Sequence, residues 1–161
     1  MVTILKEICF NKMAELENKI GRNKKAFVEI DGKNIEIAKG MEVEAYPGKK
    51  SVIAAIFHDL FGNETYITEF HLNDHIGAKG YAEKAGNLIS EMLMNPHCIV
   101  LDKEKGALLY GVYVDSDKRY YFTVVGQQSR KIFTVERKAG FFENTERYVI
   151  LYQRLQHGSK I

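Results

Sequence analysis

Two stretches of the chain repeat their apolar residues every three or four positions, whereas most of the remainder alternates apolar with polar residues. A period near 3.6 predicts a helix, and a period of two predicts a half-buried strand. The first helix covers residues 3–21 and ends at Gly21, a residue typical of helix C-caps. The second covers residues 74–94 and stops before Asn95-Pro96. Their apolar faces consist of Ile4, Ile8, Leu16 and Ile20 in the first and Ala85, Leu88, Ile89, Met92 and Leu93 in the second.

A hairpin is predicted directly after the first helix. Residues 27–37 alternate on both sides of Asp31-Gly32, a pair that favours a tight hairpin turn. Residues 41–46 then predict a third short strand, which ends at the turn-forming pair that follows it.

The segment before the second helix contains one clear strand and one ambiguous region. Residues 65–70 alternate and predict a strand. Residues 51–62 fit either a helix or a buried strand, and we favour the helix because five apolar residues recur at helical spacing. Those five are Val52, Ile53, Ile56, Phe57 and Leu60.

Four alternating segments follow the second helix and are joined by short turns, which predicts an antiparallel meander. For residues 145–156 the pattern leaves a strand and a helix equally open. The expected fold class is therefore α+β, with an N-terminal helix and hairpin and then a long helix packed on a four-stranded antiparallel sheet. We expect residues 1–64 to form an appendage, possibly for partner docking, and residues 65–161 to form the main domain. The four strands are residues 98–102, 107–115, 120–127 and 131–137.

Composition adds limits on location and partners. The 161 residues are 45% hydrophobic and carry a net charge of +2, so one sizeable core is expected. The charge is uneven, because residues 1–97 have 12 basic and 14 acidic residues whereas residues 98–161 have 11 and 7. The second half is thus the better candidate for binding an anion. Cys9 and Cys98 predict reduced thiols, and no leader or membrane span is apparent, so we expect a cytoplasmic protein with no membrane partner.

The stretch EFHLNDHIGAKG, residues 69–80, holds the most reactive side chains. If a helix begins near Leu72, His71 and His75 share one face and could bind a phosphate or a metal, or act as acid and base in one reaction. Equally, one histidine could cap the helix while the other is solvated. A zinc site is disfavoured because the spacing lacks the glutamate of metalloprotease helices and has no downstream ligand cluster, although Asp74 or Glu69 could be a third ligand. We therefore predict no metal and no cofactor.

The meander is rich in aromatic and basic residues, so one sheet face could stack a base while cations bind its phosphate. The alternative is that the aromatic residues form the core and the cations are ordinary solvated side chains. Strict alternation in the last strand would place Thr134 on the same face as Arg130 rather than Arg137. The candidate RNA-binding residues in the meander are Lys118, Arg119, Tyr121, Lys131 and Arg137.

In its order of elements, the region of about residues 65–137 resembles prophage and mobile-element proteins grouped with barnase, EndoU, colicin-type and RelE-type ribonucleases. The matching pattern is a strand, then HLNDHI, then ISEMLMNPHCIV leading into a sheet of LLYGVYV, YYFTVVG and KIFTVER. This resemblance implies a metal-independent cytoplasmic ribonuclease, acting as a toxin or a prophage-borne processing enzyme. It further implies a catalytic set of His71 or His75, Arg130 and Thr134, with Tyr121 and Lys79 contributing to RNA binding.

Two other classes of function stay open at this level. A non-catalytic module, such as an immunity or phage regulatory protein, would use the same sheet face to bind RNA or a protein. A structural phage component would form stable homo-oligomers and have no affinity for RNA. For a ribonuclease, the expected partners are RNA and possibly an inhibitor or phage protein.

Overall fold

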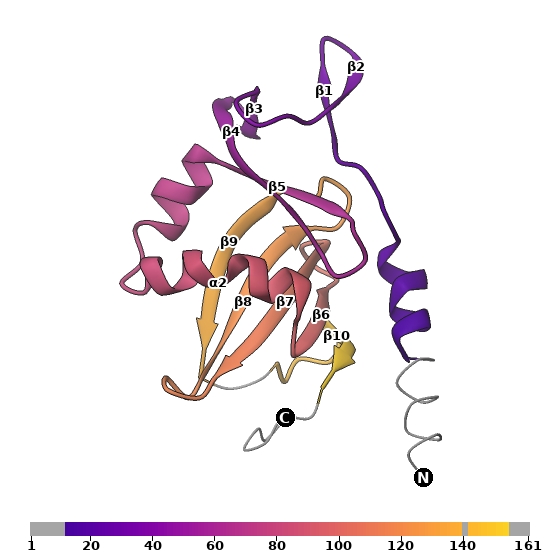
Figure 1. Cartoon of the computed structure of the whole chain (residues 1–161), viewed down its shortest axis with the longest axis vertical. Helices are drawn as coiled ribbons and strands as arrows, with labels where there is room; N and C mark the ends of the chain where they lie inside the picture. Colours follow the sequence, from indigo (N-terminus) through magenta and orange to yellow (C-terminus); the bar gives the residue numbers. More distant parts are fainter. Residues whose placement is uncertain (1–11, 140–141, 155–161) are drawn as a thin grey trace.

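The computed structural model describes residues 12–139 and 142–154. It is a mixed α and β structure in which most residues in regular elements belong to antiparallel strands (Figure 1). The largest sheet has the order β10-β6-β7-β8-β9. Its strands are β6 (Cys98–Asp102), β7 (Ala107–Val114), β8 (Arg119–Gly126), β9 (Ile132–Lys138) and β10 (Tyr148–Gln153).

The antiparallel pairing of β6, β7, β8 and β9 in chain order confirms the predicted meander. The segment whose type the sequence left open is a strand, β10, and it pairs with β6. The sheet therefore has five strands rather than four, with β10 at one edge and β9 at the other.

One long helix covers a face of this sheet. Helix α2 (Ala82–Met94) buries Ala85, Ile89, Met92 and Leu93 in a core shared with β7, β8 and β9. The prediction that this helix begins at Asp74 is wrong. Residues His71–Ile76 instead form a π-helical segment, η1, which is separated from α2 by a short connection. Gly77 completes this wider helical turn, because its N–H donates to the carbonyl of Leu72 five residues earlier. A side chain would not fit at this position, since a Cβ on residue 77 would lie 2.4 Å from the backbone oxygen of Asn73.

A second sheet has the order β3-β4-β5, with β3 (Glu42–Tyr46), β4 (Lys49–His58) and β5 (Glu64–Thr68). The strands predicted at residues 41–46 and 65–70 are confirmed, but the helix favoured for residues 51–62 is wrong, because β4 occupies that region. Both faces of β4 are covered: Ile53 packs with one apolar cluster and Phe57 with another. An irregularity in the ladder between Ile53 and Ala55 also shifts the alternation, so the buried residues acquire a spacing that imitates a helix.

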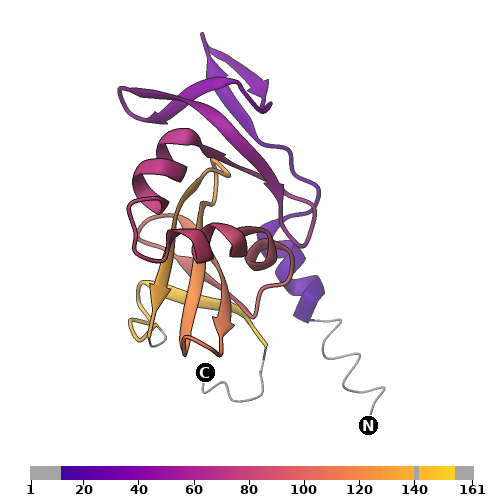
Figure 2. The ribbon, with the colours of Figure 1, turned by 60° about the vertical axis from the view of Figure 1, so that its left-hand side comes forward.

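The predicted hairpin is present as β1 (Phe27–Ile30) and β2 (Lys33–Glu36). Its turn residues Asp31 and Gly32 both have positive φ angles, of 51° and 78°, as the tight turn requires. In Figure 2 the hairpin and the three-stranded sheet lie at the top of the view and the five-stranded sheet lies below them.

Two further contacts connect the first third of the chain to the rest. A helix over residues 12–20 buries Leu16 and Ile20 in the same core as Ile67 and Leu93, and its predicted first part lies outside the described residues. A parallel bridge between Tyr66 and Lys131 places β5 beside the start of β9. The division of the chain into an appendage and a main domain at residue 64 stays a prediction.

Candidate functional site

The histidines His71 and His75 lie on η1, beside the edge strand β9. Their ring centroids are 4.9 Å apart, so the two imidazoles form a pair. They differ in environment, because His71 is 3% exposed whereas His75 is exposed to solvent. Phe70 and Phe133 approach the ring of His71 edge-on, with centroids at 5.3 and 6.0 Å.

Burial determines the protonation of His71. Loss of solvent, followed by the positive fields of His75 and Lys131, lowers the pKa of His71 to about 4, so this ring is neutral at neutral pH. Its Nδ1 lies 2.9 Å from Oγ1 of Thr68, which also accepts the backbone N–H of His71 at 3.3 Å. The Thr68 hydroxyl thus orients the ring and influences which nitrogen carries the proton.

A lysine that follows η1 contacts a threonine on the neighbouring strand β9. Nζ of Lys79, which follows η1, donates to Oγ1 of Thr134 at 2.8 Å and also to the carbonyl of Val135. The same ammonium lies 5.8 Å from the ring centroid of Tyr81. Two residues that the sequence analysis selected separately are therefore in direct contact across 55 positions of the chain.

The predicted alternation along β9 is wrong. The partners of Val124 and Val125 on β9 are Thr134 and Ile132, so Phe133 is an extra residue in the ladder. This bulge puts Ile132 and Val135 in the same core and Phe133 in the core of the opposite face. Thr134 contacts Lys79, whereas Arg130 lies before β9 and points to Asp59 and Glu64.

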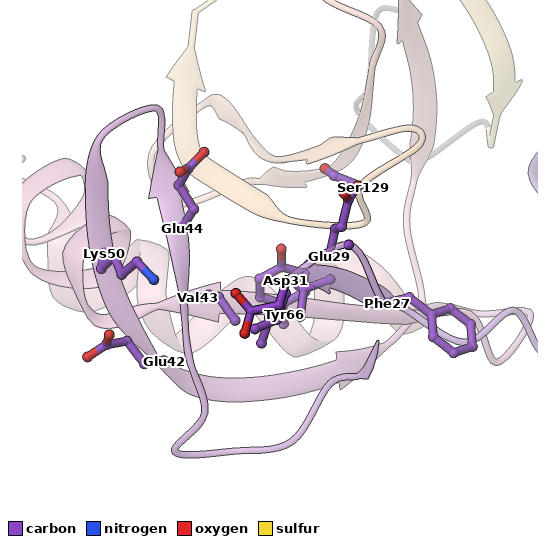
Figure 3. A pocket seen from close by; sticks show the side chains of 12 residues that line it. Phe27, Glu29, Asp31, Glu42, Val43, Glu44, Lys50, Tyr66 and Ser129 are labelled. Atoms are coloured by element: carbon purple, nitrogen blue, oxygen red, sulfur yellow. The ribbon is translucent and has the colours of Figure 1, made fainter. Parts of the chain in front are cut away.

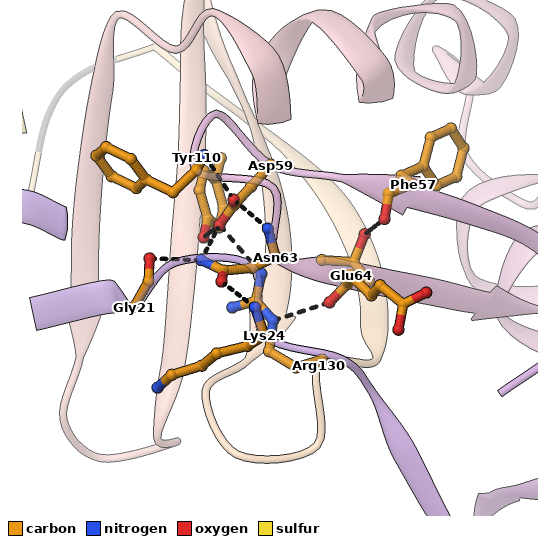
Figure 4. A network of polar contacts seen from close by, with 10 residues as sticks. Gly21, Lys24, Phe57, Asp59, Asn63, Glu64, Tyr110 and Arg130 are labelled. Atoms are coloured by element: carbon orange, nitrogen blue, oxygen red, sulfur yellow. Dashed lines mark hydrogen bonds and ion pairs between the residues drawn. The ribbon is translucent and has the colours of Figure 1, made fainter. Parts of the chain in front are cut away.

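Arg130 belongs to a different cluster, which is buried (Figure 4). Its Nη2 lies 3.2 Å from Oδ2 of Asp59, and its Nε donates to the carbonyl of Glu64 at 3.0 Å. The side chains of Arg130 and Asp59 are 5% and 0% exposed. The arginine predicted to be catalytic therefore has its charge neutralised inside the protein, and its guanidinium contacts none of the other predicted catalytic residues.

Lys131 lies between the histidines and the three-stranded sheet. Its Nζ donates to the carbonyls of Glu44 and Ala45 at 2.9 and 2.8 Å, and burial lowers its pKa. Its charge nevertheless acts on His71, as the lowered pKa of that ring indicates.

The remaining predicted RNA-binding residues lie toward the other end of β9 and on the β7–β8 turn. A cleft of about 520 Å³ is lined by Tyr121 and Arg137, together with Tyr81 from the start of α2. The guanidinium of Arg137 stacks 4.4 Å from the centroid of Tyr81, and the hydroxyl of Tyr121 donates to Asp117. Lys118 in the turn before β8 and Arg119 at the first position of β8 are exposed and do not line this cleft.

The sequence analysis missed the residues that orient this site. Thr68 precedes His71 by three positions, a spacing that could have suggested a hydroxyl partner for the histidine. Nothing in the sequence near Tyr81 indicated that it would contact Arg137 in the cleft. Among the described residues, no three His, Cys, Asp or Glu side chains are close enough to hold a metal ion. No helix in the described ranges is long and apolar enough to cross a membrane.

Comparison with known proteins yields no match among protein-family models, curated proteins or solved structures.

Proposed function

We propose that the chain is a metal-independent ribonuclease of prophage or mobile-element type that cleaves RNA by attack of the ribose 2′-OH. The observation that carries the proposal is the pairing of a buried neutral histidine, His71, with an exposed one, His75, at a centroid distance of 4.9 Å. Lys79 follows η1 and contacts Thr134 on β9, the strand that lies beside η1, so an ammonium and a hydroxyl are in contact on elements next to the one that carries the pair.

In this mechanism neutral His71 accepts the proton of the 2′-OH while the 2′-oxygen bonds to the adjacent phosphorus. The bond from phosphorus to the 5′-oxygen breaks, and protonated His75 donates its proton to that leaving oxygen. The products are a 2′,3′-cyclic phosphate and a 5′-hydroxyl. Lys79 and Lys131 stabilise the negative charge that gathers on the phosphoryl oxygens, a role that Arg130 cannot fill while it is paired with Asp59.

The strand β9 supplies a path for the RNA beyond the reacting phosphate. The charge of Lys131 acts on His71, Thr134 contacts Lys79, and Arg137 lies six residues after Lys131 beside the cleft of Tyr81 and Tyr121. A single strand that followed β9 would therefore meet cations and aromatic rings in turn. We place the activity in the cytoplasm, with a protein inhibitor or phage protein as a possible partner, and these assignments belong to the proposal.

The test is cleavage of single-stranded RNA by the full chain in EDTA. We expect a 2′,3′-cyclic phosphate end and no cleavage of DNA, because DNA lacks the nucleophile. His75→Ala should lower the rate roughly 10²–10⁴-fold, and His71→Gln should do the same while its circular dichroism shows a folded protein. The matched control is His58→Ala, since His58 is an exposed histidine at the end of β4.

A second candidate function is a non-catalytic module that binds RNA or a protein. Two observations favour it: a histidine whose pKa is about 4 is a weak base, and the predicted catalytic Arg130 is held in a buried ion pair. RNA binding without cleavage, unchanged in His75→Ala and in the double histidine variant, would replace the ribonuclease proposal with this one.

A further inference from the structure

A cavity of about 520 Å³ lies between the β1–β2 hairpin and strand β3 (Figure 3). Strands β4 and β5 contribute Lys50 and Tyr66 to its wall, and the loop before β9 contributes Ser129. The histidine pair, Lys79 and Thr134 are not among its lining residues. The cavity is thus a separate site, and the ribonuclease proposal does not use it.

The lining is strongly acidic. Four acidic residues line the cavity, against a single basic residue, Lys50. None of the four is in an ion pair within the described part of the chain, although other acidic residues of the protein are paired in this way. The cavity therefore presents a net negative charge that no described side chain neutralises by an ion pair. The four are Glu29, Asp31, Glu42 and Glu44.

Tyr66 provides an independent indication of a ligand. Its side chain is 2% exposed, it lines the cavity, and in Figure 3 it lies between Val43 and Asp31. Its hydroxyl forms no hydrogen bond with any described residue, and Tyr66 lines the cavity. Burial raises the pKa of Tyr66 to about 12, so the phenol stays neutral and can both donate and accept. A buried hydroxyl normally has a partner, which this cavity leaves for a ligand to supply.

Because the acidic residues are spread over the cavity wall, they suit an organic cation better than a metal ion. A divalent metal needs several ligand atoms converging on one point, and no such group of side chains occurs in the described ranges. The walls also include apolar side chains from Phe27, Val28 and Val43. Separated negative charges with apolar surface between them are complementary to an organic cation whose charged group is attached to a hydrocarbon stem.

We propose that this cavity binds an alkylammonium or alkylguanidinium cation, with its stem against the apolar wall, its charged group among the four carboxylates and Tyr66 as a neutral hydrogen-bond partner. Such a group is available from the lysine or arginine side chain of a partner polypeptide and from a free polyamine. The two sources share the chemistry and differ in size and in the number of charges.

The experiment is calorimetric titration of the full chain, at low ionic strength, with N-acetyl-arginine methylamide and separately with spermidine. Saturable binding of the arginine compound assigns a polypeptide side chain as the ligand, and binding of spermidine alone assigns a polyamine; either result supports the site. The neutral isostere N-acetyl-citrulline methylamide should not bind. Absence of binding by both cations would overturn the proposal.

Variants test the position of the site. Glu29→Gln with Glu42→Gln should weaken binding about tenfold, because two unpaired charges are removed. Tyr66→Phe should weaken it about threefold through loss of one hydrogen bond. The matched control is Glu91→Gln with Glu143→Gln, two exposed carboxylates outside the cavity that change the net charge equally. Equal weakening by the control pair, or no weakening by the cavity variants, would show general charge attraction and reject the site.

Discussion

Two clusters of polar side chains lie near the edge strand β9. One is in the loop that joins β4 to β5 and the other is on the π-helical segment that follows β5, and they differ in how many of their hydrogen-bonding groups have partners. In the loop, Asp59 accepts hydrogen bonds from five donors, including the hydroxyl of Tyr110 at 2.8 Å and the guanidinium of Arg130 at 3.2 Å (Figure 4). On the π-helical segment, and among the residues that the structure describes, the ring of His71 has one hydrogen-bonding side-chain partner and the exposed ring of His75 has ring contacts alone.

The contrast suggests different roles for the two clusters, a structural one for the Asp59 cluster and a chemical one for the histidines. A buried charge with every acceptor occupied fixes the position of the chain segments around it and has no capacity left for a substrate. Asn63 extends that role, because its amide binds the carbonyl of Gly21 and the N–H of Lys24 as well as Asp59. The histidine pair, by contrast, keeps ring nitrogens available, as a site that exchanges protons requires.

The strongest test of the contrast is Asp59→Ala. Removing the carboxylate leaves the Arg130 charge buried and unpaired, so the free energy of unfolding should fall by about 3 to 5 kcal/mol. Urea denaturation measures this loss. Asp74→Ala is the control, since Asp74 is exposed and in no ion pair, and it should change stability by less than about 0.5 kcal/mol. Equal effects from both substitutions would remove the distinction between the clusters.

The burial of His71 should make the free energy of unfolding depend on pH. The pKa of His71 is about 4 in the folded protein and near 6.5 when unfolded, so the unfolded chain binds more protons between these values. Its contribution to stability is fully present above pH 6.5 and is lost as pH falls toward 4, on the order of 3 kcal/mol in total. Unfolding measured at intervals across this range should show a shallower slope for His71→Gln. The difference between the two slopes isolates His71 from His97, whose pKa burial also lowers.

The smallest expected effect comes from Tyr110→Phe. The ring remains in the core while one of the five hydrogen bonds to Asp59 is lost, so we expect a loss of about 1 to 2 kcal/mol in the free energy of unfolding. Tyr113→Phe removes a hydroxyl from a half-buried tyrosine with no hydrogen bond to Asp59 and serves as the matched variant. A neutral result for Tyr110→Phe would mean that the remaining four donors satisfy the carboxylate by themselves.

Much of the fold could be predicted from local pattern, and the errors have physical causes. The meander could be predicted because each of its strands pairs with the next one in sequence across a short turn. Strand β4 was mistaken for a helix because it is covered on both faces and irregular near Ala55. The late start of α2 depends on a π-helical segment, which periodicity does not distinguish from an α-helix.

The candidate site was predictable where its chemistry lay close together in sequence. The spacing of four positions suggested the pairing of His71 and His75, which is what the structure has. The buried ion pair of Arg130 could not be predicted from the sequence, because its partner Asp59 lies 71 positions earlier and only the tertiary fold brings the two together. The partner of Thr134 depended on the bulge at Phe133, for which the alternating pattern gave no signal.

The contact between β5 and β9 also constrains when the surroundings of the histidine pair can assemble during synthesis. His71 leaves the ribosome well before Lys131, whose charge acts on its ring, and Lys79 must wait 55 residues for its hydroxyl partner Thr134. Such distant closure comes late in folding because loop entropy opposes it. Under the ribonuclease proposal, a product that ends before β9 lacks Lys131 and Thr134 and should not cleave the RNA being translated.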